Sequence, residues 1–234
     1  MSEAADNNKS AAAADEGEVK GHLGLIAAMT REFTATRDAH IMARTGLERI
    51  TKYVGAEASS LFLLADDGDE LVCSACFGPV DITGLHIPAD EGVVGRCYQE
   101  RSVQMVRDVS EDEDFGAMVD EKTGFTTKSI LCAPLSLGDE CLGCIEIINK
   151  SDGDGLFEHV DLMLLETLAG AAALAIHNFR LTQQVVQQER EQHELELAAQ
   201  IQRQLLPPME GPDFPVHGIN MAARSVSGDF YDVL

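Results

Sequence analysis

The chain has 234 residues, of which 45% are hydrophobic, and its 40 Asp and Glu against 17 Lys and Arg give a formal net charge of −23. A surface this acidic repels nucleic-acid phosphates and anionic lipid, so we expect no nucleic-acid or membrane partner. No apolar run approaches the roughly 20 residues that span a bilayer. The six cysteines and the absence of a secretory signal in MSEAADNNKSAAAADEGE predict a cytoplasmic protein.

The beginning of the chain is expected to be a tail followed by helix. Residues 1–18 are mostly Ala, Ser, Asn and acidic residues, which predicts a disordered acidic tail. From Val19 onward the apolar residues follow helical periodicity, which predicts a helix over 19–37 and further helix up to about residue 50. This helical region is interpreted as two helices, or as one that is broken near residues 34–38.

The middle of the chain has the pattern of strands and turns. Two hairpins are indicated by apolar runs that flank the turn-forming segments ADDGD and GDE. The predicted strands are 59–65, 70–77, 103–108, 129–137 and 141–150, and the predicted short helices lie at 93–100 and within 111–124. This order predicts an α+β domain built on an antiparallel sheet.

A helical signal extends from Leu156 to Leu206. Its first part, LMLLETLAGAAALAI, is apolar enough to lie against the sheet. Residues 181–206 are predicted to form a coiled-coil-like helical linker, or alternatively a solvated helix with scattered apolar residues. Half of its heptad seam is Gln or Ala, which favours weak, switchable pairing. The seam positions are Leu181, Val185, Gln188, Gln192, Leu195, Ala199, Gln202 and Leu206.

Four stretches resemble a GAF domain of the cyclic-nucleotide-binding branch found in phosphodiesterases and some adenylyl cyclases. They are SSLFLLADDGDELV, IPADEGVVGR, DEKTGFTTKSILCAPL and GCIEIINKSDGDGLFEHVD, in that order within residues 38–180. The resemblance implies the GAF fold, a six-stranded antiparallel sheet flanked by helices, and a homodimer formed through the terminal helices. It also implies a small-molecule sensor, with cAMP or cGMP as the leading ligand.

Carried over position by position, the resemblance places a set of residues around the ligand. A helix that opens at Gly92 offers backbone N–H groups to a phosphate. An aromatic ring at position 77 would stack on a purine, or would be ordinary core. The carboxyl group at position 146 would bind the base if it is buried, or would be a surface group if it faces outward. The set is Ser60, Phe77, Val93, Val94, Asp120, Thr123, Thr127 and Glu146.

A second motif of the same branch is present as Asn149, Lys150, Phe157 and Asp161. Lys150 and Asp161 are predicted to pair across a loop and hold the last helix against the sheet, as a structural clasp. The branch ends this motif with a Glu, where this chain has Leu162.

Two further positions depart from the guanine-binding version of the family. Gly78 replaces an Asp that would read the base, and Gly116 replaces an aromatic residue that would cover the pocket. These departures leave cyclic AMP, another small ligand, or no ligand open. In the last case the chain would be a ligand-free dimerisation and protein-interaction module.

The cysteines form a CxxC…CxxC pattern, which is typical of zinc sites. The first pair, Cys73 and Cys76, lies within a predicted strand, where residues three apart point to opposite faces and cannot bind one ion. We therefore interpret these residues and the pair Cys141 and Cys144 as buried apolar side chains.

The segments ELELAAQIQRQLLPP (194–208) and MAARSVSGDFYDVL (221–234) resemble the start of a metal-dependent serine/threonine phosphatase domain of the bacterial PPM type, known from sporulation and stress responses. The resemblance implies that Asp229 and Asp232 belong to a two-ion Mg²⁺ or Mn²⁺ site whose other ligands come later. We therefore expect residues 207–234 to be a truncated start of that domain, with a partial metal site and no complete catalytic site. The full-length protein is expected to dephosphorylate a regulatory phosphoprotein.

Overall fold

The computed structural model describes residues 39–116, 118–205 and 226–227, together with Gly21, Gly24 and Ala27. The expected tail, most of the helix expected over 19–37, and most of residues 207–234 lie outside the described residues. The chain divides into two compact units, residues 1–177 and 178–234, and each is described by itself.

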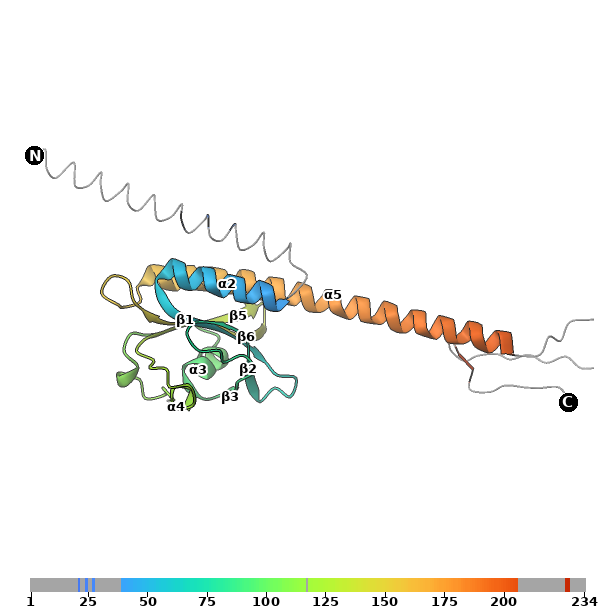
Figure 1. Ribbon diagram of the computed structural model, residues 1–234, viewed down its shortest axis with the longest axis horizontal. Coiled ribbons are helices and arrows are strands. Elements are labelled where there is room, and N and C mark those ends of the chain that lie inside the picture. The colour runs from blue at the N-terminus through green and yellow to red at the C-terminus, as the bar shows by residue number, and fades with distance from the viewer. Residues whose placement is uncertain are drawn as a thin grey trace, which may run out of the picture. The chain divides into compact units, whose positions relative to one another are not determined.

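The first unit is an α+β domain around one antiparallel sheet (Figure 1). The strand order is β3-β2-β1-β6-β5-β4, which confirms the expected six-stranded antiparallel sheet of the GAF fold. Its elements in chain order are α2 (Ala39–Val54), β1 (Ala56–Leu64), β2 (Glu70–Phe77), β3 (His86–Pro88), α3 (Gly92–Glu100), β4 (Gln104–Val106), the 3-10 helix η1 (Val109–Glu111), α4 (Met118–Thr123), β5 (Ile130–Leu137), β6 (Glu140–Lys150) and the first part of α5 (His159–Leu205).

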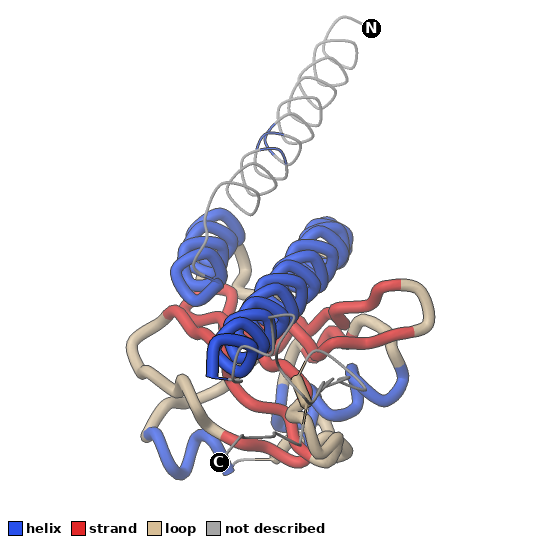
Figure 2. Tube along the Cα trace, turned by 90° about the vertical axis from the view of Figure 1, so that its right-hand side faces the viewer, coloured by secondary structure: helices blue, strands red, loops and turns tan. Residues whose placement is uncertain are grey.

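Helices cover both faces of this sheet, α2 and α5 on one side and α3 and α4 on the other (Figures 1 and 2). Because side chains alternate along a strand, the central strands contribute to two separate cores. The core under α2 and α5 contains Leu47, Ile50, Leu61, Leu131, Ile147, Phe157, Leu165 and Leu168. The core under α3 contains Phe62, Leu71, Ile87, Val93, Val94, Cys97, Cys132 and Cys144.

The first part of α5 is a core helix of this unit. Contrary to the expectation from the sequence, one stretch of α5 is long and apolar enough to cross a membrane by length and composition. Core helices of soluble proteins pass the same test, and this stretch buries Leu164, Leu165, Leu168, Ala172 and Ile176. The burial of these side chains in the domain core explains its apolar character.

In the second unit α5 continues from Asn178 to Leu205. Apolar side chains of the expected seam are exposed on this helix, with exposed fractions of 47% for Leu181, 53% for Val185 and 49% for Leu195. The Gln202 side chain binds the backbone of Ser227, donating a hydrogen bond of 2.7 Å to its carbonyl and accepting one of 2.9 Å from its N–H. The pairing of this seam with a second copy stays a prediction.

The expectation that Cys73 and Cys76 point to opposite faces is wrong. The register between β1 and β2 shifts at Leu61 and Phe62, whose partners are Ala75 and Cys73, so that β2 carries one extra residue. A β-bulge of this kind reverses the alternation of side chains beyond it. Both cysteines are therefore buried in the core under α3.

Candidate functional site

A cavity of about 140 Å³ opens in the first unit between the sheet, the first turn of α3 and residues 115–127. Its walls include all eight positions at which the sequence placed a ligand: Ser60, Phe77, Val93, Val94, Asp120, Thr123, Thr127 and Glu146. Most of the remaining wall is apolar and was not predicted: Phe62, Cys76, Ile82, Ile87, Phe115, Val119, Phe125, Ile130 and Ile148. That these residues bind a ligand stays a prediction, but they do surround one space.

Glu146 is the buried acid of this cavity. It lies on β6 between its strand partners Ser60 and Cys132, and only 6% of it is exposed. The Ser60 hydroxyl donates a hydrogen bond of 2.7 Å to Glu146 Oε1, and Oε2 makes no hydrogen bond to the described residues. Burial raises the pKa of Glu146 to about 7, and the negative charges of Cys97 and Asp120 act in the same direction. A carboxyl with this pKa is partly protonated near neutral pH, so it can donate a hydrogen bond to an occupant of the cavity as well as accept one.

Asp120 and Thr127 form a hydrogen-bonded polar pair in the cavity wall. The Thr127 N–H and hydroxyl both donate to the Asp120 carboxylate, each over 2.7 Å. The Thr123 hydroxyl donates to the Val119 carbonyl over 2.7 Å. The two threonine hydroxyl protons are thus committed to the protein, and the Thr123 oxygen also accepts a hydrogen bond of 3.2 Å from the Phe125 N–H. A role as donors to a ribose, as the sequence suggested, would require these bonds to break.

Phe77 both borders the cavity and packs against the core on the other face of the sheet. Its neighbour Cys76 belongs to the core under α3, whereas Phe77 packs against the core under α2 and α5. The Lys52 ammonium nitrogen lies 5.7 Å from the centre of its ring. Stacking of the Phe77 ring on a purine stays a prediction, and Phe115 and Phe125 are further aromatic residues that line the cavity.

The first turn of α3 supplies hydrogen-bond donors. The first backbone bond of this helix runs from Gly95 N–H to the Glu91 carbonyl over 3.2 Å, and the Glu91 side chain does not cap the helix. The N–H groups of Gly92, Val93 and Val94 therefore have no carbonyl partner in the helix, and all three residues line the cavity. Such a turn suits an anion.

The side chains around the cavity are acidic rather than basic. Glu91, Asp120 and Glu146 line it, and none of the described lining residues is Lys, Arg or His. An anionic ligand would therefore depend on the backbone amides of α3 and on protonation of Glu146.

Arg96 holds the segment that covers the cavity. Its guanidinium binds both oxygens of Asp112, over 3.2 and 2.8 Å, and Asp114 over 2.5 Å. The Arg96 guanidinium keeps the pKa of Asp112 below its usual range. The ion pairs connect α3 to the segment that carries Phe115, which stands next to the Gly116 that replaces the family's aromatic residue.

Gly78, the other departure from the guanine-binding pattern, has a packing role. Its φ is +152°, and a Cβ atom at this position would lie 2.7 Å from the Cβ atom of Ala58. An Asp at this position would require β1 to move.

The predicted clasp residues meet at the end of β6. Asn149 adopts a left-handed conformation, with φ +57°. Its side-chain oxygen accepts from the Lys128 N–H over 2.7 Å, and its amide donates to the Thr126 carbonyl over 2.8 Å. Lys150 Nζ lies 2.5 Å from Asp161 Oδ2, and both side chains are largely buried. This contact joins β6 to the start of α5.

Phe157 and Asp161, the other two residues of the predicted clasp, also make specific contacts. Phe157 is fully buried, and its carbonyl accepts a hydrogen bond of 2.9 Å from Arg107 Nε. Asp161 also accepts from the Glu158 N–H over 2.8 Å, which satisfies one of the amides before the first turn of α5. The predicted metal ligands Asp229 and Asp232 lie outside the described residues.

Comparison with known proteins agrees with this fold. The family description "GAF domain" matches residues 36–177. Among solved structures, the GAF domain of a phosphoenolpyruvate-protein phosphotransferase from Coxiella burnetii superposes with a TM-score of 0.62 at 21% identity, over 69% of this chain and 95% of that one. At this identity the similarity concerns the fold.

Curated relatives include cyclic-nucleotide phosphodiesterases. A "Probable 3',5'-cyclic phosphodiesterase pde-5" from Caenorhabditis elegans is 29% identical over 151 residues, which is 59% of this chain and 20% of the relative. A "Dual 3',5'-cyclic-AMP and -GMP phosphodiesterase 11A" from Takifugu rubripes is 28% identical over 139 residues, 55% of this chain and 15% of the relative. The chain thus spans a fifth or less of the length of these relatives. With more than half of its residues matched by the family description, this chain belongs to the GAF domain family.

Proposed function

We propose that this chain is a small-molecule-sensing regulatory module whose ligand is a cyclic nucleotide, held in the cavity between α3 and the sheet. The observation that carries the proposal is that one cavity gathers all eight positions that the family resemblance assigns to the ligand. They include Ser60 and Glu146, which are 86 residues apart and hydrogen-bonded. The similarity to domains of cyclic-nucleotide phosphodiesterases supports the choice of ligand class.

The polar groups of the cavity suit the two ends of such a ligand. The unpartnered amides of Gly92, Val93 and Val94 match a singly charged cyclic phosphate, which needs donors but no counter-ion of full charge. The base would lie among Phe115, Phe125 and other apolar side chains. Adenine presents adjacent donor and acceptor groups, which a partly protonated Glu146 can satisfy. Together with Gly78 and Gly116 this favours cyclic AMP over cyclic GMP.

The test is calorimetric titration of cyclic AMP and cyclic GMP into the chain after removal of bound nucleotide. We expect micromolar or tighter binding of cyclic AMP, and its loss in Glu146→Ala. The matched control is Glu140→Ala, because Glu140 is exposed at the other end of the same strand. Absence of heat with either nucleotide, from a folded protein, would favour the alternative of a ligand-free interaction module.

We further propose that the module dimerises and controls a metal-dependent PPM-type protein phosphatase in the full-length protein through the helical linker. Support comes from the resemblance of residues 194–208 and 221–234 to the start of such a domain, with Asp229 and Asp232 as Mg²⁺ or Mn²⁺ ligands. Exposed Leu181 and Val185 on α5 support pairing of the linker. Cysteine cross-linking along residues 181–206 tests it: unchanged cross-links with and without nucleotide would contradict signalling through this helix.

A further inference from the structure

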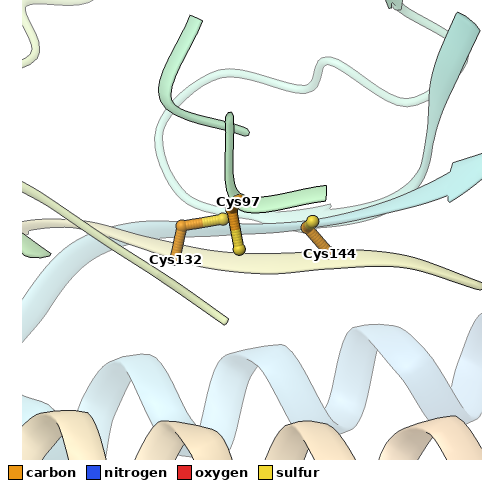
Figure 3. A group of neighbouring side chains, drawn as sticks. All are labelled: Cys97, Cys132 and Cys144. Atoms are coloured by element: carbon orange, nitrogen blue, oxygen red, sulfur yellow. The ribbon is translucent and has the colours of Figure 1, made fainter. Parts of the chain in front are cut away.

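Three cysteines that no motif connects meet beside the cavity. The sulfur atoms of Cys97, Cys132 and Cys144 all lie within 4.8 Å of one another. Figure 3 shows their side chains entering the same space from α3, β5 and β6. Each of the three residues is 0% exposed, and none is among the residues that line the cavity. Of the CxxC…CxxC cysteines, only Cys144 belongs to this thiol cluster.

The surroundings of the thiol cluster are apolar. Cys132 and Cys144 point to the α3 side of the sheet, into the core that contains Phe62, Val94 and Ile130. The Cys144 thiol donates a hydrogen bond of 3.6 Å to the Val94 carbonyl. Three thiols therefore share a space in which they have little to bind except one another.

Burial and mutual contact hold the protons of the three thiols. Burial raises the pKa of Cys132, and the thiols of Cys132 and Cys144 form hydrogen bonds with the Cys97 sulfur. Only a strongly thiophilic ion would displace the protons of such buried thiols.

The geometry is within reach of three-coordinate binding. Arsenic(III) carries a lone pair and binds three sulfurs in a pyramid, so bonds of about 2.3 Å place the sulfurs about 3.4 Å apart. The separations, all within 4.8 Å, need a contraction of up to about 1.4 Å, which rotation of the cysteine side chains can supply. The three ligands come from three elements, so binding would tie α3 to the two central strands.

We propose that Cys97, Cys132 and Cys144 form a three-thiolate site for a trivalent thiophilic ion of the arsenite type. Thiolates select soft ions. Charge selects among them, since a net charge buried in an apolar core is costly. Three thiolates neutralise a trivalent ion, whereas they leave one negative charge with Zn²⁺ and two with Cu⁺.

The binding reaction is a ligand exchange without oxidation or reduction. One As(OH)₃ reacts with three thiols to form three arsenic–sulfur bonds and three water molecules. Each thiol proton leaves with one hydroxide, so no proton is released to solvent. Binding of Zn²⁺ to the same three thiols would release three protons, and proton release is therefore a second way to tell the two ions apart.

The experiment uses the full chain, reduced with a phosphine, which does not compete as a thiol would. Sodium arsenite is added, unbound ion is removed by gel filtration, and arsenic per chain is measured. We expect one arsenic per chain, and its loss in Cys97→Ser, Cys132→Ser and Cys144→Ser. Cys141→Ser and Cys73→Ser are matched controls, because both residues are buried cysteines outside the thiol cluster. Circular dichroism checks that each variant is folded.

A second measurement uses the unchanged protein, so it tests the site even if the cysteine variants do not fold. After arsenite binding, free thiols are alkylated and the peptides are mapped. Protection of Cys97, Cys132 and Cys144 supports the site. Protection of the Cys73 and Cys76 pair instead, binding of Zn²⁺ but not arsenite, or no bound arsenic, would each overturn it.

Discussion

Replacing Glu146 with Gln should change how the stability of the domain depends on pH. Glu146 is buried on the central strand β6, and its pKa rises from an ordinary 4.5 to about 7 in the folded protein. Below pH 4.5 the carboxyl is protonated in both the folded and the unfolded state, so it does not change the free energy of unfolding. As the pH rises from 4.5 to 7, Glu146 ionises in the unfolded chain but stays largely protonated in the folded protein. The free energy of unfolding therefore falls over this range.

The magnitude follows from the two pKa values. Each pKa unit corresponds to about 1.4 kcal/mol, so the full effect is about 3 kcal/mol and is complete above roughly pH 8. Part of this destabilisation is already present at pH 5, so the free energy of unfolding should fall by about 2 to 3 kcal/mol between pH 5 and pH 8. Gln has the shape of protonated Glu and cannot ionise. Glu146→Gln should therefore gain stability relative to the unchanged protein as the pH rises.

The assay is urea unfolding followed by far-ultraviolet circular dichroism, because the chain contains no Trp. Unfolding free energies are measured for both proteins at several pH values, and their difference is plotted against pH. All other titrating groups cancel in this difference. Glu113→Gln, at an exposed position, serves as the control and should give a flat line. A flat line for Glu146→Gln as well would refute the buried, proton-binding carboxyl.

Three further changes test the cavity and its supports. If cyclic AMP binding requires protonated Glu146, its affinity should fall above pH 7 by up to about tenfold per pH unit. The Glu146→Gln variant should lose this pH dependence, which calorimetry at several pH values measures. Arg96→Ala removes the ion pairs to Asp112, which costs about 1 to 3 kcal/mol locally, so hydrogen exchange should rise across residues 109–116 and not in β6. Lys150→Met strands the largely buried charge of Asp161 and should cost about 3 to 5 kcal/mol in urea unfolding, most of which a second change, Asp161→Leu, restores.

The sequence predicted the sheet well where apolar runs were long and bounded by turn residues. The segment 70–77 coincides with β2, and the two expected hairpins are β1–β2 and β5–β6. The strand β3 was missed because three residues, His86–Pro88, are too few to show alternation. The bulge in β2 was missed because no Gly or Pro marks it, and this reversed the predicted faces of Cys73 and Cys76.

The site was predictable in position and less so in detail. Resemblance to a family located the cavity walls, because the positions of side chains follow from the fold. It did not show that Phe77 turns towards α2, nor that the threonine protons are used by Val119 and Asp120. Both depend on local hydrogen bonds and on the register of a strand. The thiol cluster was invisible because its members lie 12 to 47 positions apart and only tertiary packing brings them together.

Two elements connect these features physically. The helix α3 carries the cavity amides at Gly92–Val94, the Arg96 ion pairs and then Cys97, within two turns. The strand β6 carries Cys144 and Glu146 on one face and ends in the contacts of Lys150 with the start of α5. A ligand that binds the α3 amides and the Glu146 carboxyl contacts both elements at once. A ligand that favours one position of α3 would therefore also act on β6, and the end of β6 contacts the start of α5 through Lys150 and Asp161.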